Sequence, residues 1–334
     1  MQRASVPVYF AQQMLRNSIA QGLEPTELLR RSRISPRLLS EPGARISVPR
    51  MADLQTVVML AMDDEGMGYE PRKRAIGTWS MMCHAVFGSH NLGQAISRYA
   101  RFFGLFDFGL RPKLIEHQNT LIIRFQGASG EQWEYHAFAY EFAMFNMYRF
   151  LCWLIEQHLP LLAVNLRHPQ PPAAIEYASM FAANPVVFGA EQYELVLRQP
   201  LMELRVRQTE AGLARYLRQP VLMMLMQRYR QSSWTVRVRH ALGNRLESMP
   251  ELEQVSSVLS VHPQTLRRRL AREGTTFKEL KQQIRRDMAL HHLGRDTLSI
   301  ADIAERTGFS ESSAFIRAFR GWTGTTPYTY RKGL

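Results

Sequence analysis

The feature that most constrains the fold is a pair of short amphipathic segments joined by a tight turn, which occurs twice in the last hundred residues. In the first copy, four apolar residues at helical spacing predict a short helix: Leu252, Val255, Val258 and Leu259. A turn is expected over 260–262, and Pro263 suits the first position of the next helix because its φ is already helical. Hairpins this short cannot bury an apolar face alone, so the pattern predicts a small all-helical domain.

The second helix of this copy has two chemically different sides. Leu266 and Leu270 are four residues apart and are expected to face the core. The opposite side carries Gln264, Arg267, Arg268 and Ala271. Arg can bond bidentately to guanine and Gln to adenine, so this side is suited to a DNA major groove.

The second copy follows about fifty residues later. Ser299 and Asp302 resemble a capping box, and the helix they begin is expected to bury Ile300, Ile303 and Ala304. Gly308 should end that helix, and Ser310 can cap the next one. Four residues of the next helix are expected to turn inward: Phe315, Ala318, Phe319 and Trp322. Four others should face outward and contact DNA: Ser312, Ser313, Arg317 and Arg320.

A continuous helix is predicted over 277–293, between the two copies, with Phe277, Leu280, Ile284 and Met288 on one side. It would hold the two copies at a fixed separation. If both recognition helices lie on one face of a duplex, they should sit about one helical turn, roughly 34 Å, apart in successive major grooves.

Charge is distributed unevenly along the chain. Residues 1–200 carry a net charge of only +2, whereas 201–233 carry +4 and 234–334 carry +7. A basic excess confined to one end is the electrostatic footprint of a nucleic-acid-binding domain, because Lys and Arg neutralise phosphates and release counterions.

These residues carry a specific resemblance. The run SIADIAERTGFSESSAFIRAFRGWTGTTPYTYR and the run TLRRRLAREGTTF resemble the two helix-turn-helix units of the AraC/XylS family of bacterial transcription regulators. The resemblance implies that Gln264, Arg267 and Arg268 face bases in the first unit, and Ser312, Ser313 and Arg317 in the second. Short Ser and Ala side chains surround Arg317, which puts base reading by the second helix in doubt and favours phosphate contacts or DNA shape there.

The first two hundred residues predict a mixed, helix-rich domain. Strands are expected at 120–125, 162–166, 186–188 and 193–197. A long helix over 131–158 is apolar on nearly every face, so it should be buried; its charged residues argue against a membrane span. Its aromatic residues are explained mainly by core packing, and the alternative is a small-molecule site formed by Trp133, Phe138, Phe142 and Phe145.

The fold class predicted for the whole chain is α+β and helix-rich. We expect an effector-sensing and dimerisation domain over 1–203, a connector over 204–232 containing Pro220, and a double helix-turn-helix domain over 233–334. The runs RISVPRMADL, NLGQAISRYARFF and NPVVFGAEQYELVL resemble a family branch whose sensor is called arabinose-binding-like. That resemblance implies control by a small molecule without identifying arabinose.

The expected partners are promoter DNA, a small-molecule effector, RNA polymerase and a second copy of the chain. No cofactor and no metal site are expected, because the pairs Cys83–His84 and His291–His292 have the wrong spacing for a closed ligand set. No catalytic motif is found, so no enzyme activity is predicted. Two cysteines without a disulfide pattern and a start without a signal-peptide pattern predict a cytoplasmic protein.

Two alternatives remain open from the sequence. One is a DNA-architectural protein without sequence preference, which would bind promoter and random duplex equally. The other is an enzyme domain fused to a DNA-binding tail, which would turn over a metabolite.

Overall fold

The structure is a computed structural model that describes residues 5–41, 43–128, 132–182, 185–227, 234–243, 250–272, 275–293 and 298–332. The chain divides into two compact units that do not follow chain order. The first consists of 1–12, 25–54 and 230–334, and the second of 13–24 and 55–229. Two helices, α1 (Val8–Ala20) and α3 (Val48–Met62), have residues in both units.

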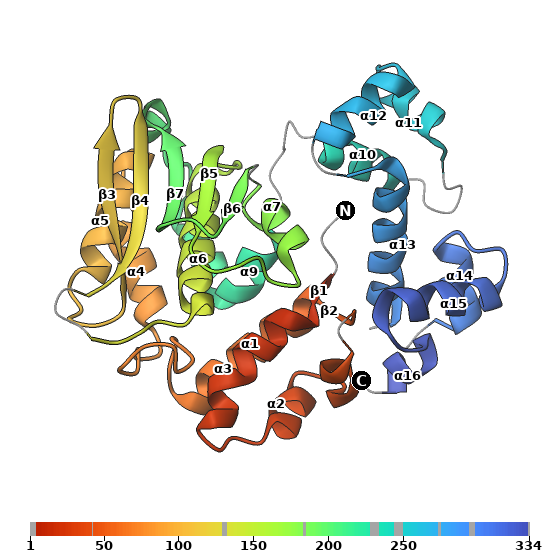
Figure 1. The fold of residues 1–334 in the computed structure, drawn as a ribbon, viewed down its shortest axis with the longest axis horizontal. Helices are drawn as coiled ribbons and strands as arrows, with labels where there is room; N and C mark the ends of the chain where they lie inside the picture. The colour runs from red at the N-terminus through yellow and green to blue at the C-terminus, as the bar shows by residue number, and fades with distance from the viewer. Residues whose placement is uncertain are drawn as a thin grey trace. The chain divides into compact units, whose positions relative to one another are not determined.

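The second unit is built on a five-stranded sheet (Figure 1). Its strand order is β3 (Leu110–His117), β4 (Thr120–Gly127), β7 (Tyr193–Arg198), β5 (Leu161–Leu166) and β6 (Val186–Phe188). Every neighbouring pair is antiparallel except β5 and β6. The other elements of this unit are α4 (Thr78–Val86), α5 (Leu92–Phe103), α6 (Ala137–Ile155), η2 (Ala174–Glu176), α7 (Tyr177–Met180), η3 (Gln199–Glu203), α8 (Glu210–Arg218) and α9 (Pro220–Met226).

The two faces of the sheet differ in character. Along β4, Leu121, Ile123 and Phe125 are buried and alternate with more accessible residues, as expected for a strand with one face against the core. On the other face, Arg124 donates to Glu194 at 2.9 Å across the β4–β7 pair, and Asn165 of β5 donates to the same carboxylate at 3.0 Å. The four strands predicted from sequence are present. The edge strand β3 was not predicted; it contains Pro112, which only an edge strand tolerates well.

The aromatic helix is shorter than expected and is largely buried. It spans Ala137–Ile155 instead of 131–158, and fourteen of its residues are buried. His136 begins it by accepting a hydrogen bond from the Phe138 backbone N–H. Glu156 ends it in the left-handed region at φ 53°. The prediction of a helix covered on most sides agrees with this burial.

The first unit contains the C-terminal helices: α10 (Trp234–Gly243), α11 (Leu252–Val258), α12 (Pro263–Arg272), α13 (Phe277–Leu293), α14 (Ile300–Arg306), α15 (Ser312–Thr323) and α16 (Pro327–Lys332). It also contains N-terminal elements: α2 (Pro25–Arg31), η1 (Pro36–Ser40) and an antiparallel ribbon of β1 (Ser5–Pro7) and β2 (Arg45–Ser47). The all-helical C-terminal region and the mixed N-terminal region together give the α+β, helix-rich fold class predicted from the sequence.

The ribbon contacts α13 through buried polar groups. The Ser5 hydroxyl donates to the Asp287 carboxylate at 3.0 Å and accepts from Arg45 at 3.1 Å. Asp287 is 2% exposed and also has Arg286 Nε at 3.5 Å. Because a buried carboxylate needs such partners, residues from the start of the chain help to stabilise the middle of α13.

Candidate functional site

The first helix-turn-helix unit forms around a core drawn from α10 to α13. Leu266 and Leu270 of α12 are fully buried in it, together with Leu252 and Val255 of α11, as the spacing predicts. Val258 is 55% exposed, contrary to the prediction. At 100° per residue it lies a third of a turn away from Leu252, outside the apolar face.

The turn between α11 and α12 is tight. Ser260 has a φ of 54°, and the Val261 backbone N–H donates to the Ser256 carbonyl at 3.0 Å. Pro263 begins α12, as expected. The turn therefore fixes the direction in which α12 leaves the core.

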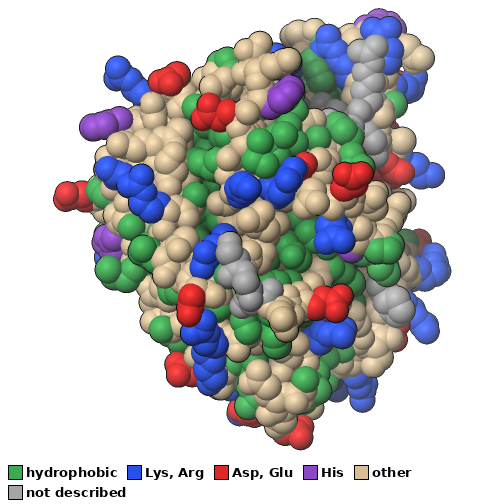
Figure 2. All heavy atoms as spheres, turned by 60° about the vertical axis from the view of Figure 1, so that its left-hand side comes forward, with side chains coloured by type: hydrophobic (Ala, Val, Ile, Leu, Met, Phe, Trp, Pro, Cys, Tyr) green, Lys and Arg blue, Asp and Glu red, His purple; other side chains and the backbone are tan. Residues whose placement is uncertain are grey.

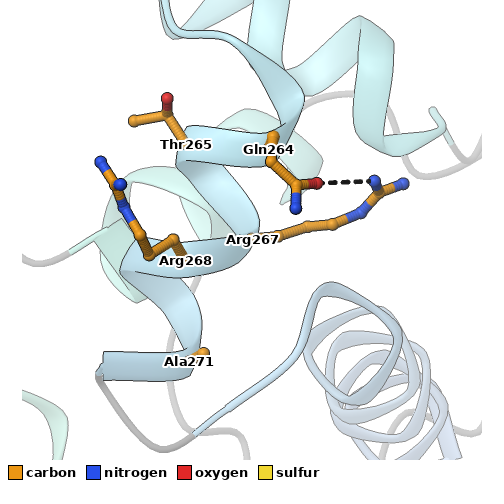
Figure 3. Close-up of a pocket in the computed structure, with 5 residues that line it drawn as sticks. All are labelled: Gln264, Thr265, Arg267, Arg268 and Ala271. Atoms are coloured by element: carbon orange, nitrogen blue, oxygen red, sulfur yellow. Dashed lines mark hydrogen bonds between the residues drawn. The ribbon is translucent and has the colours of Figure 1, made fainter.

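The exposed side of α12 carries the side chains predicted to read bases (Figure 3). Gln264, Arg267 and Arg268 are all exposed, and with Thr265 and Ala271 they line a shallow hollow along the helix. Gln264 accepts a hydrogen bond from Arg267 at 3.3 Å. Arg267 also has Glu253 at 3.8 Å, a loose and exposed ion pair that contributes little and can be given up to a phosphate or a base.

The third consecutive arginine of α12 has a different environment. The Arg269 guanidinium lies over the Trp234 ring at 4.1 Å, with Arg237 at 3.9 Å from the same ring. These cation–π contacts attach α12 to α10. Arg269 therefore serves packing, whereas Arg267 and Arg268 point away from the core.

The second helix-turn-helix unit forms around an aromatic core. Phe315 and Phe319 of α15 are fully buried and their rings are 5.7 Å apart, and Tyr330 of α16 lies 5.6 Å from Phe319. Burial raises the pKa of the Tyr330 hydroxyl. Ile303 and Ala304 of α14 are also buried, as predicted.

The capping of this second unit is partly as expected. Ser299 accepts from the Asp302 N–H at 3.1 Å while Asp302 accepts from the Ser299 N–H at 2.9 Å, which completes the predicted capping box. The Ser299 hydroxyl also donates to the Asp302 carboxylate at 2.7 Å, and this hydrogen bond, together with the one from the Ser299 N–H, lowers the pKa of the Asp302 carboxyl. The prediction that Ser310 caps α15 was wrong, because the cap position is Glu311 and the helix begins at Ser312.

The outward side of α15 is less charged than that of α12. Ser313, Arg317 and Arg320 are exposed and Ser312 is partly buried. Ser313 donates to Glu311 at 3.1 Å. Ile316 is 37% exposed beside Arg317.

The helix α13 joins the two units and has the predicted bounds, Phe277–Leu293. Leu280 and Ile284 belong to the first core. Further along, Arg285 donates to the Gly308 carbonyl at 3.0 Å, and its guanidinium lies 4.8 Å from the centre of the Phe309 ring. Gly308 and Phe309 form the turn of the second helix-turn-helix unit. Burial lowers the pKa of Arg285. The core of the first helix-turn-helix unit and the turn of the second are thus attached to one helix.

A cavity lies within the compact unit formed by 13–24 and 55–229, which contains the five-stranded sheet. It has a volume of about 120 Å³, and its wall is formed by α3, α4, α5, α6, β3, β4, α9 and the loop over 63–77. Of the four aromatic residues suggested for a small-molecule site, only Phe142 lines it.

The other three lie elsewhere. Phe138 is buried behind Phe142, with ring centres 6.1 Å apart. Phe145 packs against Phe181, and Trp133 is 47% exposed. Their role in effector binding stays a prediction.

The cavity has one polar side, which the sequence did not indicate. Arg74 forms a two-point ion pair with Glu70, with one N···O distance of 2.9 Å, and these side chains are 9% and 11% exposed. Glu65 accepts from the backbone N–H groups of Gly77 and Trp79, each at 2.7 Å. Burial nevertheless raises the pKa of Glu65.

A second buried polar cluster lies outside the cavity. Glu141 of α6 accepts from the Tyr177 hydroxyl at 2.7 Å and has His168 Nε2 at 3.0 Å. These residues are far apart in the sequence, so no local signal could have found the cluster. In the described part of the chain, no group of three or more His, Cys, Asp or Glu residues could hold a metal ion, and the side chain of His291 lies outside that part. None of the described helices is long and apolar enough to span a bilayer.

The exposed side of α12 differs in charge from the face of the molecule drawn in Figure 2. The face drawn in Figure 2 shows Lys and Arg interspersed with Asp and Glu around hydrophobic side chains. This mixture contrasts with the exposed side of α12, where the three longest side chains are two arginines and a glutamine.

Comparison with known families gives two matches. Residues 22–206 match the model described as the arabinose-binding domain of AraC transcription regulator, and residues 255–333 match a helix-turn-helix domain. The chain is 26% identical to the ornithine utilization regulator of Pseudomonas aeruginosa over 98% of this chain and 96% of that protein. It is 42% identical to the regulator VirS of Mycobacterium tuberculosis over 24% of this chain and 23% of that protein. The solved structure of the regulator CdpR from Pseudomonas aeruginosa aligns with 97% of this chain and 98% of that chain at 22% identity, with a TM-score of 0.32.

Proposed function

The chain belongs to the AraC family of DNA-binding transcription regulators, and from this premise we propose that it recognises specific promoter sequences under the control of a small-molecule effector. The observation that carries the proposal is the exposed side of α12. There, Gln264, Arg267 and Arg268 stand opposite the buried Leu266 and Leu270. This is the arrangement in which a helix can enter a major groove while its other side stays in the core.

The second part of the proposal is that α15 enters the next major groove. Support comes from α13. It contacts the core of the first helix-turn-helix unit through Leu280 and Ile284, and the turn of the second helix-turn-helix unit through Arg285. A continuous helix attached at both ends holds two recognition helices at one separation. Ser313, Arg317 and Arg320 would then contact DNA, with Ser312 at the edge of the contact.

The third part is effector control through the cavity. Val221 and Met224 of α9 line it, and α9 is the last described helix before α10. A molecule in the cavity would contact the element from which the chain continues toward the DNA-binding unit. Only a difference in affinity between two states of the protein can make such binding regulatory.

The proposal retains the division into a sensor and dimerisation domain over 1–203, a connector over 204–232 and a DNA-binding domain over 233–334. It places the protein in the cytoplasm with promoter DNA, RNA polymerase and a second copy as partners. It includes no catalytic step. Phe142 is the aromatic residue that we place against the effector, with Phe138 supporting it.

The test is footprinting of the full chain on fragmented genomic DNA at ~150 mM salt, where electrostatic binding alone is weakened. Sharp protected sites near promoters, each with two protected grooves, are expected. Their occupancy should change when host metabolite extract is added. A variant with both Arg267 and Arg268 replaced by Ala should lose the sites. A smooth profile in both conditions would instead favour the architectural alternative.

A further inference from the structure

Two side chains that line the cavity of the compact unit formed by 13–24 and 55–229 each carry a hydrogen-bond donor that lacks an acceptor. Among the described residues, neither Nη1 of Arg74 nor Nε1 of Trp79 has a hydrogen-bond partner, although both atoms are buried. Both side chains line the cavity, and that of Arg74 is 9% exposed. A buried donor without an acceptor is costly, so the wall is suited to a molecule that brings one.

The acceptors on the same side of the cavity are already engaged. Both oxygens of Glu70 accept from Arg74. Both oxygens of Glu65 accept from backbone N–H groups. The neighbouring Asp64, which does not line the cavity, accepts from the backbone N–H groups of Gly66, Gly68 and Arg74. The wall therefore offers donors to a ligand and has few acceptors left to offer.

Charge narrows the class of molecule further. Glu65 and Glu70 on the wall already outnumber the single guanidinium of Arg74, which is itself paired with Glu70. A ligand carboxylate would add a further anion to this group at a cost in a buried site. A ligand ammonium would lie beside Arg74 and would leave the two donors without an acceptor. A neutral carbonyl oxygen meets neither objection, because it can accept two hydrogen bonds without adding charge.

The rest of the wall is apolar and aromatic. Trp79, Tyr99, Phe103, Phe125 and Phe142 contribute rings, and Leu110, Val221 and Met224 are among the aliphatic residues. Burial raises the pKa of Tyr99, so its hydroxyl stays protonated. The volume of about 120 Å³ is close to that of apolar protein cavities of about 150 Å³ that hold one benzene ring. The cavity thus fits a single ring or a short branched chain.

From these observations we propose that the effector is a small, uncharged molecule with one apolar ring or short chain and a neutral carbonyl group, whose oxygen accepts hydrogen bonds from Arg74 and Trp79. The inference rests on the proposed function, in that it identifies the chemistry of the effector that function requires. The buried amides of Gln55 and Asn146, which also line the cavity, would help to orient the carbonyl group.

The experiment is calorimetric titration of the full chain with four compounds of similar size. Acetophenone has a neutral carbonyl, ethylbenzene lacks it, benzoate is an anion and benzylamine is a cation. Acetophenone is expected to bind about tenfold or more tightly than each of the other three, since its oxygen satisfies donors that the others leave unpaired or meet with the wrong charge. Tighter binding of benzoate or benzylamine, equal binding of all four compounds, or no binding of acetophenone would each overturn the proposal.

Two variants show whether the binding uses the cavity. Trp79→Phe keeps a ring and removes the donor, so it should weaken acetophenone binding by roughly threefold to tenfold and leave ethylbenzene binding unchanged. The matched control is Trp153→Phe, because Trp153 is buried in α6 of the same unit and does not line the cavity. It should leave both affinities unchanged. Equal effects of the two substitutions on acetophenone would contradict the proposal.

Arg74 is not substituted in this test, because its loss would leave the buried Glu70 carboxylate unpaired and could unfold the unit. Footprinting of the same protein sample separates the two ideas. If acetophenone fails to bind but sharp promoter sites still respond to metabolite extract, the carbonyl inference is wrong while the regulator remains. If the sites themselves are absent, the proposed function is wrong.

Discussion

The two helix-turn-helix units have the same order of elements, but their recognition helices expose different chemistry. On α12, Gln264, Arg267 and Arg268 extend from one exposed side over an aliphatic core. On α15, the exposed residues include Ser313 and Arg317, over a core of aromatic rings. Long planar donors can distinguish bases, whereas short hydroxyls mainly bond phosphates. The difference suggests that the first unit selects the sequence and the second adds affinity.

The largest effect is expected from the two cores. Phe315→Ala should destabilise the second helix-turn-helix unit by about 3–5 kcal/mol, since its side chain is fully buried. Leu270→Ala should destabilise the first helix-turn-helix unit by about 2–5 kcal/mol for the same reason. Hydrogen exchange followed by mass spectrometry would measure the protection of amides in α14–α15 and α11–α12 separately. If either substitution removes protection from both units equally, the units are not independent and the comparison fails.

The next largest effect concerns base reading by the first unit. Arg268→Ala should cost about 1–3 kcal/mol in binding at one base pair and relax the preference there. Affinities for a set of operators that differ at single positions would measure this. The control is Arg268→Lys, which keeps the charge but loses the two-point contact. An equal loss on every operator would make Arg268 a phosphate contact and remove the contrast with α15.

A smaller and more uniform effect is expected at Arg317 of the second unit. Arg317→Ala should weaken binding to all operators alike and reduce the slope of log affinity against log salt by about 0.9, the value for one phosphate contact. Titrations at several salt concentrations would measure the slope. A loss concentrated at one base pair would show that the second helix also reads sequence.

The smallest effect is expected at the helix starts. Ser299→Ala removes the cap of α14 and should cost about 1 kcal/mol. Gln254→Ala removes only the return hydrogen bond to the Glu251 N–H, 2.8 Å long, and should cost less. Thermal unfolding of both variants would rank them. The reverse order would show that α11 depends more on its cap than α14 does.

The helix-turn-helix units could be predicted closely because their signals are local. The spacing of Leu266 and Leu270, the position of Pro263 and the Ser299–Asp302 pair each act within one turn of helix. The bounds of α13 followed from the same periodicity. Ser310 was misplaced as a cap because two polar residues, Ser310 and Glu311, both precede the helix.

The cavity could not be predicted in the same way. Its wall combines residues from 55 to 224, and their meeting depends on the packing of the whole unit. The helix containing Phe142 is apolar on nearly every side, so the sequence did not show which ring would face the cavity. Glu70 and Arg74 lie in a loop between α3 and α4, and the burial of their ion pair depends on how that loop packs.

The contact between Ser5 and Asp287 has a consequence for dissecting the protein. The matched helix-turn-helix segment, 255–333, contains Asp287 but not the ribbon that supplies its hydroxyl partner. An expressed fragment that begins after the connector would leave this carboxylate with fewer bonds in the middle of α13. The compact unit that contains α13 is assembled from three separate stretches of chain, 1–12, 25–54 and 230–334, so no single cut releases it whole. We therefore expect the smallest autonomous DNA-binding piece to be larger than the segment that sequence similarity outlines.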